Sequence, residues 1–144
     1  MWFMLLGLFA CSWMDIRTKR IPNSVSYGLI PIGICIGIIR LGVKGMIAGL
    51  ILSSFTGIVL SLIHAIGGAD VKLSTALGAA FGTTGFLYGM AFTVLLAGAA
   101  GVPVIIRHWI SRDEKITTLQ QAFVPYMTVG FGIVTLQICG GLIK

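Results

Sequence analysis

The strongest constraint in this sequence is its series of long apolar runs with almost no charge. The chain has 144 residues, of which 57% are hydrophobic and only 10% are charged. A soluble domain carries about 25% charged residues, so this chain has too few to cover a water-facing surface. Backbone that faces lipid must form its hydrogen bonds within its own segment, and the runs are too long and continuous for the alternating strands of a barrel. The sequence therefore predicts an all-α polytopic membrane protein, with residues 1–144 as a single domain.

Polar or glycine-rich breaks divide the chain into about six apolar segments, each a predicted transmembrane helix. A crossing takes about 20 residues, so the fourth segment is short for a bilayer, and the first is also short. The first helix is expected to continue to the residue before Pro22, since a residue that precedes proline disfavours the helical region. The segments cover about residues 1–14, 24–39, 45–66, 73–81, 86–106 and 122–143.

Basic residues predict the direction in which the segments cross. Lys and Arg number ten against four Asp and Glu, and they lie in the gaps between apolar runs, where they act as topology signals. We expect the N-terminus outside and the chain in the cytoplasmic membrane, because more basic residues then face the cytoplasm. The basic charge thus indicates topology and contact with anionic lipid of the bilayer, and we expect no nucleic-acid partner. The cytoplasmic side would hold Arg17, Lys19, Arg20, Lys72, Arg107, Arg112 and Lys115, and the outer side Arg40, Lys44 and Lys144.

Two of the four acidic residues directly adjoin apolar runs. Asp113 and Glu114 belong to the longest polar stretch and are interpreted as solvated loop charges. Asp15 follows the first apolar segment and Asp70 the third, so two crossings separate them and both face the cytoplasm. A carboxylate at the bilayer edge is costly and indicates a functional site, although a single one also fits a solvated helix end. Two such carboxylates on one face favour function.

A pair of carboxylates can hydrolyse a peptide bond without a metal ion or a covalent nucleophile. Close together they cannot both ionise readily, so they share a proton and supply both a base and an acid. Other hydrolytic designs lack parts here, because the sequence has no H-E-x-x-H helix and no G-x-S-x-G elbow. A pair formed by Ser61 and His64 lacks a third group to orient it. The cysteines at 11, 35 and 139 lie far apart in apolar runs and form no zinc-binding pattern, so we expect no metal and no cofactor.

The residues around the two aspartates resemble the motifs of the type IV prepilin peptidase family. The first family motif is an aspartate six residues before Ile-Pro-Asn, matched by Asp15 and Ile21-Pro22-Asn23. The second is Gly-x-Gly-Asp followed by an apolar residue and a lysine. Alanine replaces the second glycine here, which is a mild departure because alanine is the next smallest residue. The positions of the second motif are Gly67, Gly68, Ala69, Asp70, Val71 and Lys72.

The resemblance implies a six-span GxGD-type intramembrane aspartic peptidase with Asp15 and Asp70 as its catalytic pair. Such enzymes remove the basic leader from prepilin or pseudopilin precursors at the cytoplasmic face, after a glycine and before the hydrophobic helix. Larger members carry an added cytoplasmic domain with zinc-binding cysteines, which N-methylates the product. This chain has no matching cysteines and resembles the compact, peptidase-only members.

The residues beside the aspartates suggest how such a site is shaped. Gly67 and Gly68 are expected to form a flexible stretch that lets a substrate strand approach closely. Pro22 breaks the chain after the first aspartate and defines the rim, and Asn23 or Ser24 can cap the next helix. Lys72 either lowers the pKa of Asp70 or extends its ammonium to the membrane interface.

One alternative from another functional class stays open. A small transporter or channel subunit could use Asp15 and Asp70 as an ion relay. Such a protein favours carboxylates deeper in the bilayer, at discontinuous helices near the midplane. The sequence names no particular prepilin and leaves open the oligomeric state, as well as which aspartate is the base.

Overall fold

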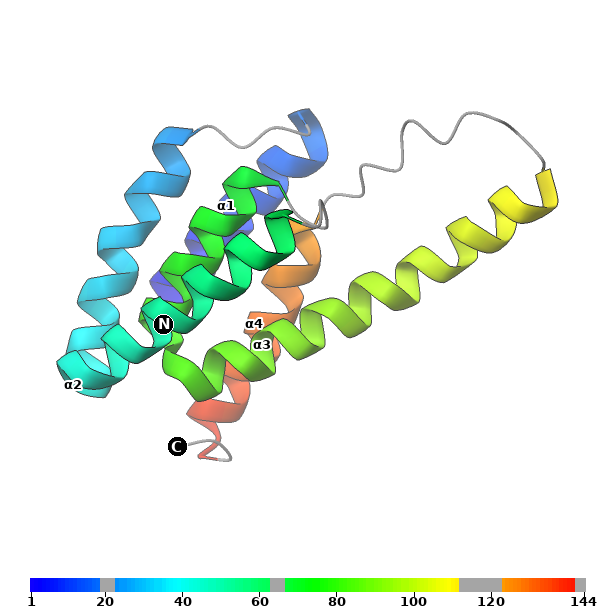
Figure 1. Ribbon diagram of the computed structural model, residues 1–144. Helices are drawn as coiled ribbons and strands as arrows, with labels where there is room; N and C mark the ends of the chain where they lie inside the picture. The colour runs from blue at the N-terminus through cyan, green and yellow to red at the C-terminus, as the bar shows by residue number, and fades with distance from the viewer. Residues whose placement is uncertain (19–22, 63–66, 112–122, 142–144) are drawn as a thin grey trace.

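The fold is all-helical, as the sequence predicts. The computed structural model describes residues 1–18, 23–62, 67–111 and 123–141, with the backbone alone over 103–111. Every regular element in these ranges is a helix (Figure 1). The helices are α1 (Trp2–Thr18), α2 (Asn23–Leu62), α3 (Gly68–Ser111) and α4 (Val124–Cys139).

The two long helices each turn sharply at a glycine. Gly42 in α2 has φ 69° and ψ 172°, and Gly82 in α3 has φ 71° and ψ −174°. A positive φ is costly for a residue with a Cβ, so glycine suits both positions. The turns fall within two breaks expected from the sequence, residues 40–44 and 82–85. They divide α2 and α3 into two segments each, and the described residues thus form six helical segments at the predicted places. That all six cross a membrane stays a prediction.

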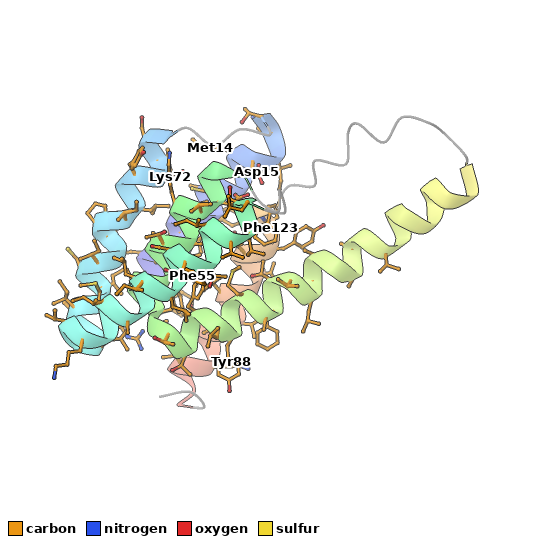
Figure 2. The ribbon with its side chains drawn as sticks, in the orientation of Figure 1. Met14, Asp15, Phe55, Lys72, Tyr88 and Phe123 are labelled. Atoms are coloured by element: carbon orange, nitrogen blue, oxygen red, sulfur yellow. The ribbon has the colours of Figure 1, made fainter. Side chains whose placement is uncertain are left out.

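The outer surface of the helices is strongly apolar. Two helical stretches, Ser24–Leu62 and Gly68–Val102, are long and apolar enough to cross a membrane. Large apolar side chains point outward along them, among them the exposed Phe55 and Tyr88 (Figure 2). A surface of this kind is solvated by lipid, so the chain is a membrane protein.

The first segment of α3 is the centre of the bundle. Leu73, Ala76, Leu77 and Ala80 are fully buried, and both segments of α2 pack against this segment. The contacts are made by glycines at the GxxxG spacings that the sequence contains. A Cβ on Gly33 would collide with the carbonyl oxygen of Ala76, one on Gly37 with that of Ala79, and one on Gly49 with that of Gly78. The backbones therefore touch directly, as small residues allow between membrane helices.

α4 closes the bundle between α1 and α3. The ring of Phe131 meets the ring of Phe81 edge-on, with 5.1 Å between centroids. The Thr128 hydroxyl donates a hydrogen bond to the Leu8 carbonyl of α1, at 3.3 Å. Because the segments run alternately up and down, the end of α1 and the beginnings of α2, α3 and α4 lie at one end of the bundle (Figure 1).

We predict that Gly33→Ala destabilises the fold, because the new methyl group must push α2 away from the Ala76 carbonyl. Overpacking of this kind costs about 1–3 kcal/mol of unfolding free energy. Thermal unfolding in detergent micelles measures the effect. Gly28→Ala, on the same helix, is the matched control, since a Cβ there meets nothing within 4 Å. Equal melting temperatures for the two variants would contradict the close packing.

Candidate active site

Asp70 lies at the beginning of the central helix, in the first turn of α3. Its Oδ2 accepts a hydrogen bond from the Gly67 N–H at 3.2 Å, while the Gly67 carbonyl accepts one from the Asp70 N–H at 3.0 Å. The bond from the Gly67 N–H to the carboxylate is the half of a capping box that an acidic residue at the third helical position supplies, since glycine has no side chain for the other half. The carboxylate is thereby held at the end of the helix, half-buried, instead of pointing along its side.

Asp15 lies near the end of α1 and is tied to the beginning of α4. Its carboxylate accepts a hydrogen bond from the backbone N–H of Val124, the first residue of α4. A helix N-terminus carries free N–H groups and a partial positive charge, so it favours an anion there. Figure 2 shows Asp15 and Phe123, the residue before α4, at the same end of the bundle. The side chain is half-buried, as that of Asp70 is.

The fold brings the two aspartates into one region. The Asp15 carboxylate is close enough to Asp70 for the two charges to interact, although 55 positions separate them in sequence. Three helix termini meet there, namely the end of α1 and the beginnings of α3 and α4. Both side chains are partly accessible.

The surroundings of Asp15 favour its protonated form. Burial raises the pKa of the Asp15 carboxyl above its ordinary value, and the hydrogen bond from the Val124 N–H opposes part of that rise. A carboxyl that holds its proton more tightly beside a second carboxylate is suited to sharing one proton between the two.

Lys72 points away from the pair. It follows Asp70 by two residues, so its side chain leaves the helix about 200° around the axis from the carboxylate. The ammonium lies over the ring of Tyr27 in α2, at 4.2 Å from the centroid, in a cation–π contact. This direction favours the interpretation in which Lys72 extends toward the interface over direct pairing with Asp70.

The glycines before Asp70 are more ordered than the sequence suggests. Only Gly67 precedes the helix, while Gly68 and Ala69 already belong to the first turn of α3. Gly68 therefore belongs to the helix, because the cap formed by Asp70 starts the helix at that residue, and that the two glycines let a substrate strand approach closely stays a prediction. A Cβ on Gly68 would meet nothing within 4 Å. Internal packing therefore does not require a glycine at this position.

Some predicted residues lie outside the described part of the chain. This holds for Pro22, which was expected to define the rim, for the segment between Thr18 and Asn23, and for His64, Asp113 and Glu114. Asn23 is the first residue of α2, but its side chain is also outside the described set. Their predicted roles stay predictions.

Sequence reasoning does not find two contacts near the aspartates, that of the Val124 N–H with Asp15 and that of the Tyr27 ring with Lys72. Proline is common in the first turn of a helix, so Pro125 does signal that a helix N-terminus begins near Val124. That this terminus faces Asp15 follows only from the packing of α4. Nothing in the spacing of Tyr27 and Lys72 indicates their contact.

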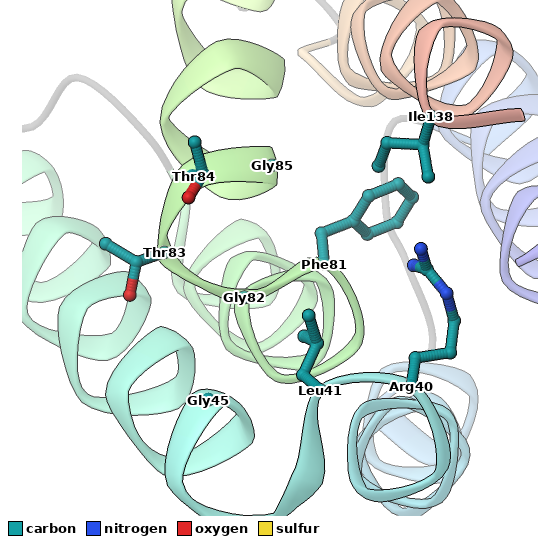
Figure 3. A pocket seen from close by; sticks show the side chains of 9 residues that line it. All are labelled: Arg40, Leu41, Gly45, Phe81, Gly82, Thr83, Thr84, Gly85 and Ile138. Atoms are coloured by element: carbon teal, nitrogen blue, oxygen red, sulfur yellow. The ribbon is translucent and has the colours of Figure 1, made fainter. Parts of the chain in front are cut away.

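A cavity lies in the bundle away from the two aspartates. Within the described ranges, no three His, Cys, Asp or Glu side chains group closely enough to hold a metal ion. A cavity of about 190 Å³ lies at the turns around Leu41 and Gly82, with Arg40, Phe81 and Ile138 in its wall (Figure 3). Twelve residues of helix, about 18 Å at 1.5 Å per residue, separate Gly82 from Asp70, so this cavity belongs to the opposite end of the bundle.

Comparison with known proteins gives one match. A family model described as the type IV leader peptidase family matches residues 2–106. The matched stretch runs from α1 into the second segment of α3 and contains both aspartates. Neither the curated proteins nor the solved structures yield a match.

We predict that Asp15→Asn stabilises the protein increasingly as the pH rises. A carboxyl with a higher pKa in the folded state than in the unfolded state binds its proton more tightly when folded. Its contribution to stability is then greatest below the ordinary pKa, about 4, and is lost as the pH rises through the folded pKa. Asn cannot ionise and avoids this loss. Thermal unfolding in detergent at pH 4 and pH 7 measures the trend.

Asp113→Asn is the control for that experiment, because a solvated loop carboxyl is expected to show no such trend. The predicted effect of burial would be contradicted if Asp15→Asn were less stable than the parent at pH 7 and if its stability relative to the parent did not increase between pH 4 and pH 7.

Proposed function

We propose that this chain, which belongs to the type IV leader peptidase family, is an intramembrane aspartic endopeptidase whose catalytic pair is Asp15 and Asp70. The observation that carries the proposal is that these two half-buried carboxylates, from distant parts of the chain, lie at helix termini that meet at one end of the bundle, close enough for their charges to interact. The family makes the protein a peptidase, and the paired carboxylates supply a means of peptide hydrolysis.

In the proposed reaction the two carboxyl groups share one proton. The ionised carboxylate accepts a proton from water as the water oxygen attacks the peptide carbonyl carbon, and the protonated one donates its proton to the carbonyl oxygen. Collapse of the tetrahedral intermediate transfers a proton to the leaving amine and restores the pair. The N–H groups of Val124 and Gly67 each hold one carboxylate in position and stabilise its ionised form.

The proposed substrate is a prepilin or pseudopilin precursor, cleaved between its basic leader and its hydrophobic helix. Both aspartates adjoin apolar helical segments, so the scissile bond would lie where a substrate helix leaves the lipid. The distribution of Lys and Arg supports a cytoplasmic location for this end of the bundle, in the cytoplasmic membrane. The open space around Gly68 leaves room for an extended peptide beside Asp70.

The transporter or channel alternative is less well supported. An ion relay of that kind uses discontinuous helices whose broken ends face the carboxylates. The two glycine turns, at Gly42 and Gly82, lie at the end of the bundle opposite to Asp70. A flux assay in proteoliposomes separates the two functions, since a peptidase should move no ions.

We predict that Asp15→Asn and Asp70→Asn each abolish cleavage of a co-expressed prepilin while the protein still accumulates in the membrane. Loss of general acid–base catalysis lowers the rate by about 100-fold or more. Immunoblots of precursor and mature pilin measure the product. Asp113→Asn carries the same chemical change in the polar loop and should cleave normally. Cleavage retained by both variants of the pair would refute the proposal.

We also predict that Gly68→Ala slows cleavage without loss of stability. A Cβ at this position meets nothing inside the protein, and alanine favours a helix more than glycine does. The methyl group would instead contact the incoming peptide. We expect cleavage to slow on the order of tenfold, which corresponds to a rise of about 1.4 kcal/mol in the activation free energy. Initial rates and melting temperature, compared with Gly28→Ala, measure both effects. Unchanged rates would mean that the substrate does not pass over Gly68.

A further inference from the structure

Ser26 of α2 is a polar residue in the core of the bundle. Its side chain is fully buried, and within the part of the chain that the structure describes its hydroxyl has no hydrogen-bond partner. Four other buried hydroxyls in the described helices each donate to a carbonyl about one turn earlier, namely those of Ser53, Ser74, Thr93 and Thr135. A buried hydroxyl without a partner costs about 1–3 kcal/mol. Alanine would serve packing better at this position, so the hydroxyl points to a role beyond packing.

The contacts between α2 and α3 give the level at which Ser26 lies. Gly33 packs on Ala76 and Gly37 on Ala79, so the first segments of the two helices run in the same direction. In α2, Ser26 lies two turns before Gly33, and in α3, Ala69 lies two turns before Ala76. Each interval is about 10.5 Å along the helix axis. The contact between Tyr27 and Lys72 fits this register.

The buried face of α2 then shows the direction in which Ser26 points. Ser26, Leu29, Gly33 and Gly37 are all buried and recur every three or four residues, so they share one face. Gly33 and Gly37 on this face touch the central segment of α3. The Ser26 hydroxyl therefore faces the bundle interior at the level of Ala69 and Asp70.

The packing of α1 leads to the same place. Leu29 of α2 packs on Gly7 of α1, and these two segments run in opposite directions (Figure 1). One turn beyond Gly7 is the buried Cys11, and one turn beyond that is Asp15. Because α2 runs the opposite way, Ser26, which lies one turn before Leu29, is displaced from the Gly7 contact toward the same end of the bundle as Cys11 and Asp15. The hydroxyl thus lies between α1 and α3, about one turn below Asp15 and level with Asp70.

We propose that the Ser26 hydroxyl binds a water molecule beneath the Asp15–Asp70 pair and through it holds the shared proton in place. A serine hydroxyl donates one hydrogen bond and accepts others, and one water extends its reach by about 2.8 Å. A buried water typically makes about three hydrogen bonds, which the hydroxyl and the two carboxylates can supply. Ser26 is then a positioning residue, and this inference rests on the proposed peptidase function.

The test is Ser26→Ala, with kcat, KM and melting temperature measured on purified protein and a prepilin substrate. We expect kcat to fall on the order of tenfold with KM unchanged, because the substrate does not touch the buried hydroxyl. The melting temperature should stay the same or rise, since a hydroxyl without a protein partner is removed. Ser26→Thr, which keeps the hydroxyl, should recover most of kcat.

Ser53→Ala is the matched control, because Ser53 is equally buried on the other segment of α2 but donates to the Leu50 carbonyl. It should leave kcat unchanged. An unchanged kcat for Ser26→Ala would overturn the inference, and so would a fall in kcat that accompanies a lower melting temperature. A stable Ser26→Thr enzyme as slow as Ser26→Ala would overturn it as well.

Parallel assays of Asp15→Asn and Asp70→Asn keep the two proposals apart. If these variants still cleave the prepilin, the proposed function fails. If they do not cleave it while Ser26→Ala cleaves at the parent rate, the inference about Ser26 alone fails.

Discussion

The structure depends on direct contact between the backbones of α2 and the first segment of α3. Within lipid there is no hydrophobic force to hold apolar helices together, so association relies on close packing and hydrogen bonds between helices. Gly33, Gly37 and Gly49 allow both segments of α2 to touch carbonyl groups of α3. A side chain at any of these positions would separate the helices. The central helix is thereby fixed in position and direction, and it begins two residues before Asp70.

The candidate site follows from where the helices end. Asp70 caps the central helix through the Gly67 N–H, and Asp15 meets the N–H of Val124 at the beginning of α4. Each carboxylate is thus held by a backbone donor at a helix terminus, in a region that is half-buried and close to the expected membrane boundary. Such backbone donors position a carboxylate, while Lys72 contacts the Tyr27 ring.

Much of this arrangement could be predicted from the sequence. The all-helical class follows from the apolar runs. The breaks at Gly42 and Gly82 follow from local glycine and polar residues. The family follows from the residues around Asp15 and Asp70. The helical state of Gly68 was not predicted, because glycine disfavours a helix by itself and the cap formed by Asp70 outweighs that preference. The GxxxG spacings at Gly33/Gly37 and Gly45/Gly49 are compatible with close helix packing but do not say which helices meet.

The sequence by itself determined the class of the fold, its six helical segments and the family, since these depend on local composition and on short motifs. Only the tertiary structure decided that α4 presents the Val124 N–H to Asp15 and that the hydroxyl of Ser26 is buried with no partner among the described residues. It also decided that the two carboxylates interact. The physical reason is that such contacts join residues far apart in the chain, and they arise from how the helices pack rather than from the preferences of any one segment.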